Sequence, residues 1–409
     1  MPINSANAYA VQQPMPNINV STRSKRIPRP LSLVPPPSTI PFNKICIYVL
    51  APYLETDDNN INYYYDFTQS IEEYTKIFGE LNASWKWQPV TMKNYSTIIE
   101  SIVADKKSKR TPVFLNLCDG DEVNGTPGIS VLKKLEALNL IYTGSEEYFY
   151  DITTSKIPMK KAFDKYKVPT AKWKMIQSAN DTVDDMFETV GRTVILKPAV
   201  SGGSMGVGVK NVVSNKTAMK KQLKKMFDGY RGWDLSIDGI IAEEFIKGRE
   251  FTTMITGSSK YPSTCKVYDP VERVFHPSLP EKEKFLSFDR LWEIYEDETP
   301  MPSNENFYEY TSVEKSLADQ IKKISFDAYK SVKGTGYTRV DIRMDDLTGK
   351  LYVLEVNAQC GISDDENFTS IGAILRLSGN RFVSLVKDLL KDAVYRAEKK
   401  GWDIPWIKN

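Results

Sequence analysis

Acidic side chains that face each other on two neighbouring strands are the most chemically suggestive feature of this sequence. Residues 337–361 read YTRVDIRMDDLTGKLYVLEVNAQCG. Charged and apolar residues alternate in the first half, which is the period of a half-buried strand, and a second apolar run follows a Thr-Gly turn. Counting outward from the turn predicts a β-hairpin with two cross-strand pairs on one face, Asp341 with Glu355 and Arg339 with Asn357.

Two opposed carboxylates repel each other unless a cation lies between them. Carboxylate and amide oxygens suit Mg²⁺, which usually completes its octahedron with water and substrate phosphates. Asp341, Glu355 and Asn357 are therefore candidate metal ligands. The alternative is a solvated hairpin end in which the carboxylates pair with Arg339 and Arg343, and these residues alone leave both interpretations open.

A lysine followed by a glycine-rich loop forms a second candidate site. The apolar run of residues 193–196 leads to Lys197 and then to AVSGGSMGVG at residues 199–208. The many glycines leave the backbone free to turn its N–H groups toward a phosphate, and Lys197 adds a positive charge. A glycine-rich hairpin turn is the alternative that this loop leaves open.

The order of these features along the chain resembles the ATP-grasp fold, and in detail the D-alanine–D-alanine ligase branch of the carboxylate–amine ligases. The resemblance covers roughly residues 110–395 and includes Lys156 ahead of the loop. Its most specific parts are three motifs, ILKPAVSGGSMGVGV, EEFIKGREFT and RVDIRMDDLTGKLYVLEVN.

The resemblance implies a nucleotide site built from these motifs. Two lysines would hold the α- and β-phosphates of ATP, the glycine loop would fold over the phosphates, the EEFI stretch would contact adenine, and a glutamate would take the ribose hydroxyls. The implied nucleotide-binding residues are, in that order, Lys156 and Lys197, then Gly202, Gly203, Ser204 and Gly206, then Glu243, Phe245 and Ile246, and finally Glu250.

The resemblance also implies the chemistry. Asp341, Glu355 and Asn357 would bind two Mg²⁺ ions, for which Mn²⁺ can substitute, and such ions neutralise charge during phosphoryl transfer. ATP would phosphorylate a substrate carboxylate, and an amine would attack the acyl phosphate to form an amide. Arg339 and the backbone N–H of Gly361 would stabilise the oxyanion of the tetrahedral intermediate.

An acyl phosphate needs protection from water, so a lid is expected. Residues 266–310 show little periodicity and are rich in Pro, Glu and Lys, which favours a mobile flap. Lys282, Lys284 and Arg290 are its candidates for reaching the γ-phosphate, and the sequence does not choose among them.

The departures from the D-alanine ligase pattern lie in the amino-acid pockets. The first strand runs into Ala51–Glu55 in place of a glycine-rich opening with a glutamate, and residues 118–120 read Cys-Asp-Gly where a His-Gly motif is expected. This chain has Gly203 at the position where the D-alanine ligases carry a loop serine. It has Gln359–Gly361 in place of their Ser-Pro-Gly motif. Substrates other than the D-Ala/D-Ala pair are therefore expected. The alternatives are an ATP-binding regulatory or scaffold protein of this fold without ligase activity, and a ligase that uses a non-amine nucleophile.

The acidic stretch Ser363–Glu366 has two interpretations. It fits a capping box in front of an apolar helix, since Ser-x-x-Glu satisfies N–H groups of a first turn. It also fits a pocket for a cationic acceptor substrate, because Glu366 falls where the D-alanine ligases hold the substrate carboxylate.

The helices and strands that would position these residues indicate an α/β protein of ATP-grasp fold. We expect an N-terminal tail followed by three domains. Strands alternate with helices in the first third, including a short strand at Leu140–Tyr142, which indicates an open parallel sheet. We expect a Pro-rich disordered tail at 1–40, an N-terminal open parallel-sheet domain at 41–147, a small central α+β lid domain at 148–257, and a C-terminal α+β domain with an antiparallel sheet at 258–409.

Composition narrows the function classes. The 54 basic residues nearly balance the 52 acidic ones, and no apolar run is long enough to cross a bilayer, so neither nucleic acid nor membrane is expected as a partner. The four cysteines are scattered, which is typical of reduced thiols in a cytoplasmic protein, although the acid-free, basic tail also fits an organelle transit peptide. The expected partners are small carboxylate and amine substrates, and the resemblance implies a homodimer.

Overall fold

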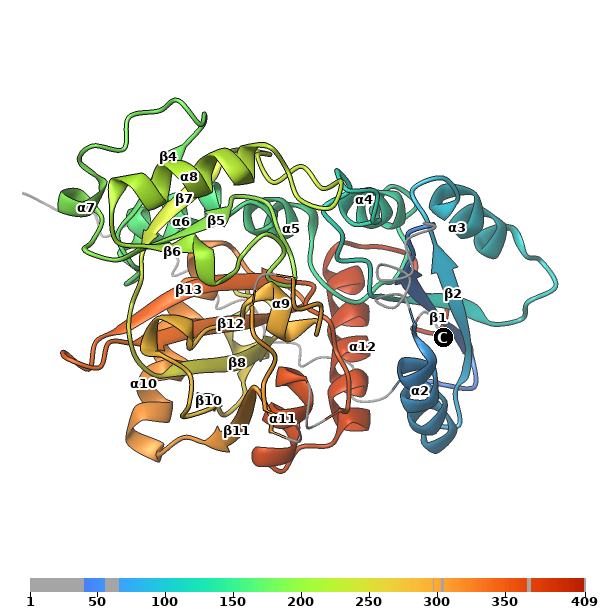
Figure 1. Ribbon diagram of the computed structural model, residues 1–409. Coiled ribbons are helices and arrows are strands. Elements are labelled where there is room, and N and C mark those ends of the chain that lie inside the picture. Colours follow the sequence, from blue (N-terminus) through green and yellow to red (C-terminus); the bar gives the residue numbers. More distant parts are fainter. Residues whose placement is uncertain (1–39, 56–65, 297, 303–304, 366–368, 408–409) are drawn as a thin grey trace, which may run out of the picture. The chain divides into compact units, whose positions relative to one another are not determined.

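The protein was examined as a computed structural model that describes residues 40–55, 66–296, 298–302, 305–365 and 369–407 (Figure 1). These residues belong to the compact unit spanning residues 36–409. The expected tail at 1–40 lies outside the described residues, except for Ile40, whose side chain is buried in the core.

The first part of the chain forms a three-stranded, all-parallel sheet in the order β2-β1-β3, as expected. Its strands are β1 (Ile45–Pro52), β2 (Ser84–Val90) and β3 (Thr111–Asn116). The helices of this part are α2 (Thr68–Glu80), α3 (Tyr95–Ala104), α4 (Ile129–Ala137) and α5 (Glu147–Thr154). The prediction of a short strand at residues 140–142 is wrong. The described residues show a single isolated bridge there, from Tyr142 to Phe114 of β3.

The second sheet is antiparallel and has the order β4-β7-β5-β6. Its strands are β4 (Trp173–Ile176), β5 (Val194–Pro198), β6 (Val212–Val213) and β7 (Ile240–Glu244). The accompanying helices are α6 (Lys156–Tyr166), α7 (Met186–Thr189), α8 (Lys216–Phe227) and the short 3₁₀ turn η1 (Val209–Asn211). The glycine loop joins the antiparallel strands β5 and β6, so it is also the connection of a hairpin.

The third sheet carries the acidic hairpin and runs β11-β10-β8-β12-β13, with β9 paired to β8. Its strands are β8 (Glu250–Thr256), β9 (Lys266–Val267), β10 (Val271–Phe275), β11 (Tyr308–Ser312), β12 (Tyr337–Met344) and β13 (Leu351–Ala358). The accompanying helices are α9 (Phe288–Leu291), α10 (Lys315–Ser331), α11 (Ser370–Leu377) and α12 (Phe382–Lys399), with 3₁₀ turns η2 (Pro262–Thr264) and η3 (Glu281–Glu283). Strand β8, which the expected domain division assigns to the central domain, pairs in this large sheet between β10 and β12.

The expectation of a structureless flap at residues 266–310 is wrong for much of its length. Strands β9 and β10 lie in this segment, β11 begins near its end, and β10 pairs with both β8 and β11. The short helix α9 is also buried.

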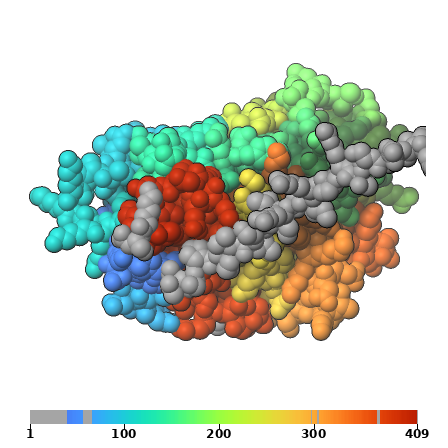
Figure 2. All heavy atoms as spheres, turned by 180° about the vertical axis from the view of Figure 1, so that it is seen from behind, coloured from blue at the N-terminus to red at the C-terminus, as the bar shows by residue number. Residues whose placement is uncertain are grey.

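One hydrophobic core joins the first sheet to the last helix. Side chains of β1 and α2 share a buried cluster with the apolar stripe of α12, as the spacing of that stripe predicts. Tyr74 of α2 packs against Phe382 of α12 with ring centroids 5.7 Å apart. Figure 2 shows the same neighbourhood from behind, with the red C-terminal residues against the blue first strand and helix. Among the described residues, no helix combines the length and apolar surface that a membrane-spanning segment needs.

Candidate active site

The hairpin β12–β13 has the register that the sequence predicts, with Asp341 opposite Glu355 and Arg339 opposite Asn357. The Asn357 Nδ2 donates to Asp341 Oδ2 at 3.0 Å and to Glu355 Oε1 at 3.2 Å. The Arg339 guanidinium donates to both oxygens of Asp341, at 3.1 and 2.9 Å. Burial alone would raise the pKa of Asp341, but this guanidinium holds the pKa below its ordinary value.

The structure therefore shows part of each interpretation of the hairpin, the metal site and the hairpin end with ion pairs. Arg339 does pair with an acid of the hairpin face, whereas Arg343 turns to Glu250 and to the backbone carbonyl of Ile246. Two carboxylate oxygens that lie within 3.2 Å of one nitrogen atom form a place where positive charge is favoured.

This set of side chains fits Mg²⁺. Asp341 and Glu355 supply carboxylates on facing strands, and Asn357, whose Nδ2 donates to both, carries the amide oxygen Oδ1 that a metal would bind. No group of three or more His, Cys, Asp or Glu side chains placed to hold a metal occurs in the described part of the chain. An ion here would therefore take its remaining ligands from water and phosphate, as Mg²⁺ usually does.

The lysines of the nucleotide motifs lie beside this hairpin. Lys156, at the start of α6, donates through Nζ to the backbone carbonyl and hydroxyl oxygens of Ser201, at 3.2 and 3.1 Å. Lys197, at the end of β5, forms a 2.7 Å ion pair with Glu243 of β7. Burial lowers the pKa of Lys156, against the effect of the Glu355 carboxylate, whereas Glu243 and Glu355 outweigh burial and raise the pKa of Lys197. Glu355 of β13 thus acts on a lysine of α6 and a lysine of β5.

Lys160 is a partner that sequence reasoning missed. It is fully buried, donates to Thr170 Oγ1 at 2.5 Å, and forms an ion pair with the second oxygen of Glu243. Burial alone would raise the pKa of Glu243, but the ammonium groups of Lys160 and Lys197 outweigh it and lower the pKa to about 2. The sequence feature that could have identified Lys160 is its position four residues after Lys156, which puts both lysines on the same face of a helix.

The glycine loop has an unusual backbone. Gly203, Ser204 and Gly206 have φ angles of +52°, +62° and +71°. Successive residues of this kind can turn neighbouring N–H groups toward one anion. The loop is fastened beside Lys156, whose backbone N–H donates to the Ala199 carbonyl at 2.8 Å.

The residues with implied adenine and ribose contacts form a second cluster. Glu250 is buried between two arginines, Arg273 and Arg343, and its Oε2 lies 3.3 Å from the Arg343 Nε. Arg343 also donates to the Ile246 carbonyl at 2.9 Å and places its guanidinium over the Phe245 ring. Neither Arg273 nor this role of Arg343 could be predicted from local sequence, because their partners lie far away in the chain.

The end of the hairpin contacts the first sheet through Gln359. This buried residue has φ +58°, its Oε1 accepts from the Ser145 N–H at 2.9 Å, and its Nε2 donates to the Asn116 carbonyl at the end of β3. A Cβ at Gly144 would lie 1.9 Å from Gln359 Oε1, so only glycine fits there. Gly361, two residues later, is exposed, and a Cβ built on it would meet nothing within 4 Å.

Asp119 lies in the loop that follows β3 at the same edge. The residue is open to solvent on one side, yet the protein atoms crowded around its carboxyl raise the pKa to about 6.

The three cations proposed for the lid differ in their surroundings. Arg290 is buried and pairs with Glu283 at 2.8 Å and with Glu298 at 3.5 Å. Lys284 pairs with Glu281, whereas Lys282 is exposed.

The expected capping box at residues 363–366 is not the cap of the helix that follows. Helix α11 begins at Ser370, and the Thr369 hydroxyl caps it by accepting from the Gly372 N–H at 3.1 Å. The Ser363 hydroxyl instead donates to Glu73 of α2 at 2.7 Å. Glu366 lies outside the described residues.

Comparisons with known proteins find D-alanine–D-alanine ligases among the relatives of this chain. The D-alanine–D-alanine ligase of Acetivibrio thermocellus is 24% identical over 340 residues, which are 81% of this chain and 78% of that protein. The D-alanine–D-alanine ligase A of Bacillus cereus is 23% identical over 252 residues, or 62% of this chain and 72% of that protein. A crystal structure of the Bacillus anthracis D-alanine–D-alanine ligase shares the fold, with TM-score 0.60 and 18% identity over 87% of this chain and 99% of that one.

The family comparison covers most of the site, but not Lys156 and Lys160, which precede the matched residues. Residues 162–391 match the protein family described as "D-ala D-ala ligase C-terminus". This match spans more than half of the chain and contains the glycine loop, Glu250 and the whole acidic hairpin. The chain therefore belongs to the D-Ala-D-Ala ligase C-terminus family and has the ATP-grasp fold of the D-alanine–D-alanine ligases.

Proposed function

We propose that this protein is an ATP- and Mg²⁺-dependent carboxylate–amine ligase that forms an amide or peptide bond and releases ADP and phosphate. The observation that carries the proposal is the convergence of two lysines and two facing carboxylates. Glu355 acts electrostatically on both Lys156 and Lys197, and Asn357 links it to Asp341. Family membership supplies the reaction class.

The nucleotide would lie along the two clusters. Lys156 and Lys197 bind phosphate oxygens, and the loop from Gly202 to Gly206 covers them with backbone N–H groups. Glu243, Phe245 and Ile246 contact adenine, and Glu250 takes the ribose hydroxyls. Because Arg343 holds both Ile246 and Glu250, it positions the adenine and ribose contacts relative to each other.

The metal-binding residues are Asp341, Glu355 and Asn357. These residues would hold two Mg²⁺ ions, or Mn²⁺ in their place, which would supply positive charge for phosphoryl transfer. Arg339 and the Gly361 N–H would stabilise the oxyanion that forms when the amine attacks the acyl phosphate. Arg339 suits this role because it is half-buried and already oriented by Asp341.

The substrates are proposed to be amino acids or other small carboxylates and amines, different from the D-Ala/D-Ala pair. Gln359 replaces the first residue of the Ser-Pro-Gly motif, and both ends of its side chain are engaged by the protein. Asp119 introduces a carboxyl at the carboxyl end of the parallel sheet, where such folds bind ligands.

The deciding experiment is an ADP-release screen of the purified protein with Mg²⁺, ATP and pairs of amino acids of both chiralities. Mass spectrometry of the products separates an amide from a thioester or a phosphorylated compound. Asp341→Asn and Glu355→Gln serve as inactive controls. Release of no ADP with any pair, together with measurable ATP binding, would support the binding-protein alternative.

A further inference from the structure

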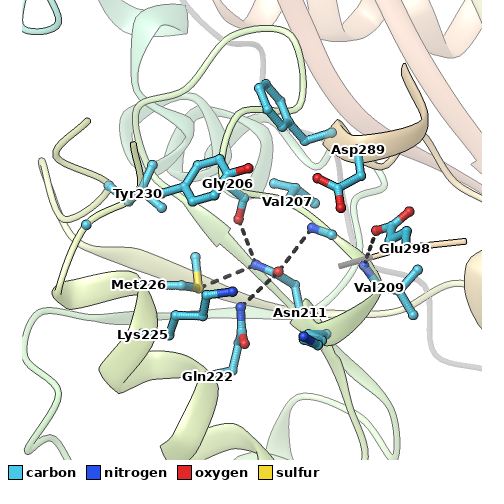
Figure 3. A pocket seen from close by; sticks show the side chains of 15 residues that line it. Gly206, Val207, Val209, Asn211, Gln222, Lys225, Met226, Tyr230, Asp289 and Glu298 are labelled. Atoms are coloured by element: carbon cyan, nitrogen blue, oxygen red, sulfur yellow. Dashed lines mark hydrogen bonds between the residues drawn. The ribbon is translucent and has the colours of Figure 1, made fainter. Parts of the chain in front are cut away.

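The segment formed by residues 287–296 and Glu298 contacts two backbone groups of the glycine loop and one directly after it. The Trp292 indole Nε1 donates to the Gly203 carbonyl at 2.8 Å, and the Phe288 N–H donates to the Val207 carbonyl at 2.8 Å. The Val209 N–H donates to Glu298 Oε1 at 2.7 Å, an interaction drawn in Figure 3. These contacts hold the loop at its middle and near its end, and hold the residue that follows it.

Glu298 is fixed on its other side as well. Its side chain is 2% exposed, its Oε2 accepts from the Ser287 hydroxyl at 2.5 Å, and the same oxygen lies 3.5 Å from the Arg290 Nη1. A buried carboxylate with both oxygens engaged has little freedom to move, so it transmits the position of the segment to the Val209 N–H.

The opposite side of the loop end is held by Asn211. Its Nδ2 donates to the Gly206 carbonyl at 2.9 Å, and its Oδ1 accepts from the Gly208 N–H at 3.0 Å and from the Gln222 Nε2 at 3.0 Å (Figure 3). A cavity of about 60 Å³ lies here, lined by the loop end, Met226 and Tyr230. A cavity of this size has room for only a few waters behind the loop.

The conformation that is held in this way is a costly one. Ser204 is not a glycine and yet has φ +62°, a region that costs such a residue of the order of 1 kcal/mol or more. Backbone strain of this kind persists only where the surroundings fix it.

We propose that Trp292 and Glu298 are positioning residues that hold the glycine loop in the shape that receives the phosphates of the nucleotide. The proposal rests on the proposed function, since it assigns the loop to phosphate. Neither residue touches the reacting atoms: Trp292 acts through Gly203, and Glu298 acts through Val209. Each therefore affects nucleotide binding through the loop.

The test compares Trp292→Phe and Glu298→Ala with the control Glu296→Gln. The phenylalanine keeps most of the ring but removes the indole N–H, and the alanine removes both Glu298 hydrogen bonds. Glu296 pairs with Arg231 and Tyr230, so this change leaves the tested hydrogen bonds of Trp292 and Glu298 in place. Glu298→Gln is the conservative variant, because its amide oxygen can still accept from Val209.

Two readouts are measured on the full-length chain. We expect each of the two test variants to raise the KM for ATP about tenfold, the effect of losing one useful hydrogen bond, while kcat falls less. Amide hydrogen exchange of residues 203–209 should speed up by a similar factor, Glu298→Gln should recover part of both effects, and the control should match the parent protein. Unchanged exchange and unchanged KM in Trp292→Phe and Glu298→Ala would overturn the proposal.

The outcome also separates this proposal from the proposed function. If the parent protein binds ATP but forms no amide, ATP affinity replaces KM as the readout. If the parent protein binds no ATP, the proposed function fails, and the assignment of the loop to phosphate fails with it. If Glu298→Ala does not fold, Trp292→Phe, a change at a half-exposed residue, decides alone.

Discussion

Asp341 shows how one carboxylate is prepared for a cation. It lies 2.9 Å from the Arg339 Nη2 and 3.0 Å from the Asn357 amide, so it remains charged although it is buried. We predict that Asp341→Asn lowers the rate of ADP release at least about 100-fold and raises the Mg²⁺ concentration for half-maximal rate. A magnesium titration of the initial rate measures both. Asp346→Asn, an exposed change in the same hairpin, should leave both values unchanged.

Glu243 carries a prediction about stability and pH. Its pKa is about 2 in the folded protein against an ordinary 4.5, so its contribution is complete above about pH 4.5 and is lost as the pH falls toward 2. Glu243→Gln leaves two buried ammonium groups without their partner, and we expect it to cost about 3–5 kcal/mol of unfolding free energy at pH 7.

Denaturant unfolding at several pH values tests this prediction. The parent protein should lose more stability than the variant between pH 4.5 and 3, because the variant no longer has that carboxylate to protonate. Glu188→Gln, an exposed change, should behave as the parent does. Equal acid sensitivity of parent and Glu243→Gln would contradict the assignment.

Among the helices and strands, the hairpin that is formed by neighbouring residues was predicted correctly from the sequence. The acidic hairpin was predicted in its correct register because alternation and a short turn determine which side chains face each other. Strand β2 is harder to predict: it lies at the edge of its sheet, is largely half-exposed and contains Pro89, although residues 84–88 alternate polar and apolar side chains. Strands β10 and β11 were missed because they are short and are joined by a long connection rich in prolines.

The contacts of the site were harder to predict than its elements. Lys160, Arg273 and Arg343 are polar residues that the fold buries against acids 83, 23 and 93 positions away. Arg273 and Arg343 face Glu250 from the strands that pair with β8 on either side, and Lys160 of α6 meets Glu243 of β7. These pairings are decided by the order of strands and the packing of a helix, and nothing local in the sequence records either. The roles of the site residues and the three-domain division stay predictions.

Helix α11 carries a prediction at this scale. The Thr369 hydroxyl satisfies the Gly372 N–H, one of the groups that a helix start leaves without an intrahelical partner. Thr369→Ala should lower the free energy of unfolding by about 1 kcal/mol, whereas Thr369→Ser keeps the hydroxyl and should cost much less. Thermal or denaturant unfolding compares the two, and equal losses would show that the hydroxyl is not the cap.

For the whole molecule, the shared core predicts that the first sheet and the last helix unfold together. Leu389 of α12 is 1% exposed in the cluster that contains β1 and α2. Leu389→Ala should therefore cost about 2–5 kcal/mol, and hydrogen exchange should accelerate in β1 as well as in α12. Leu347→Ala, at a residue that is 95% exposed, should change stability by less than about 0.5 kcal/mol. Faster exchange confined to α12 would show two independent units.

The contact made by Gln359 has a mechanical consequence. One side chain fastens the acid-bearing hairpin to Asn116 at the tip of β3 and to Ser145 beyond it. These two hydrogen bonds join the hairpin to the parallel sheet. We therefore expect any opening of the site to move the sheet that carries Lys197 and the glycine loop, and not the hairpin relative to the parallel sheet.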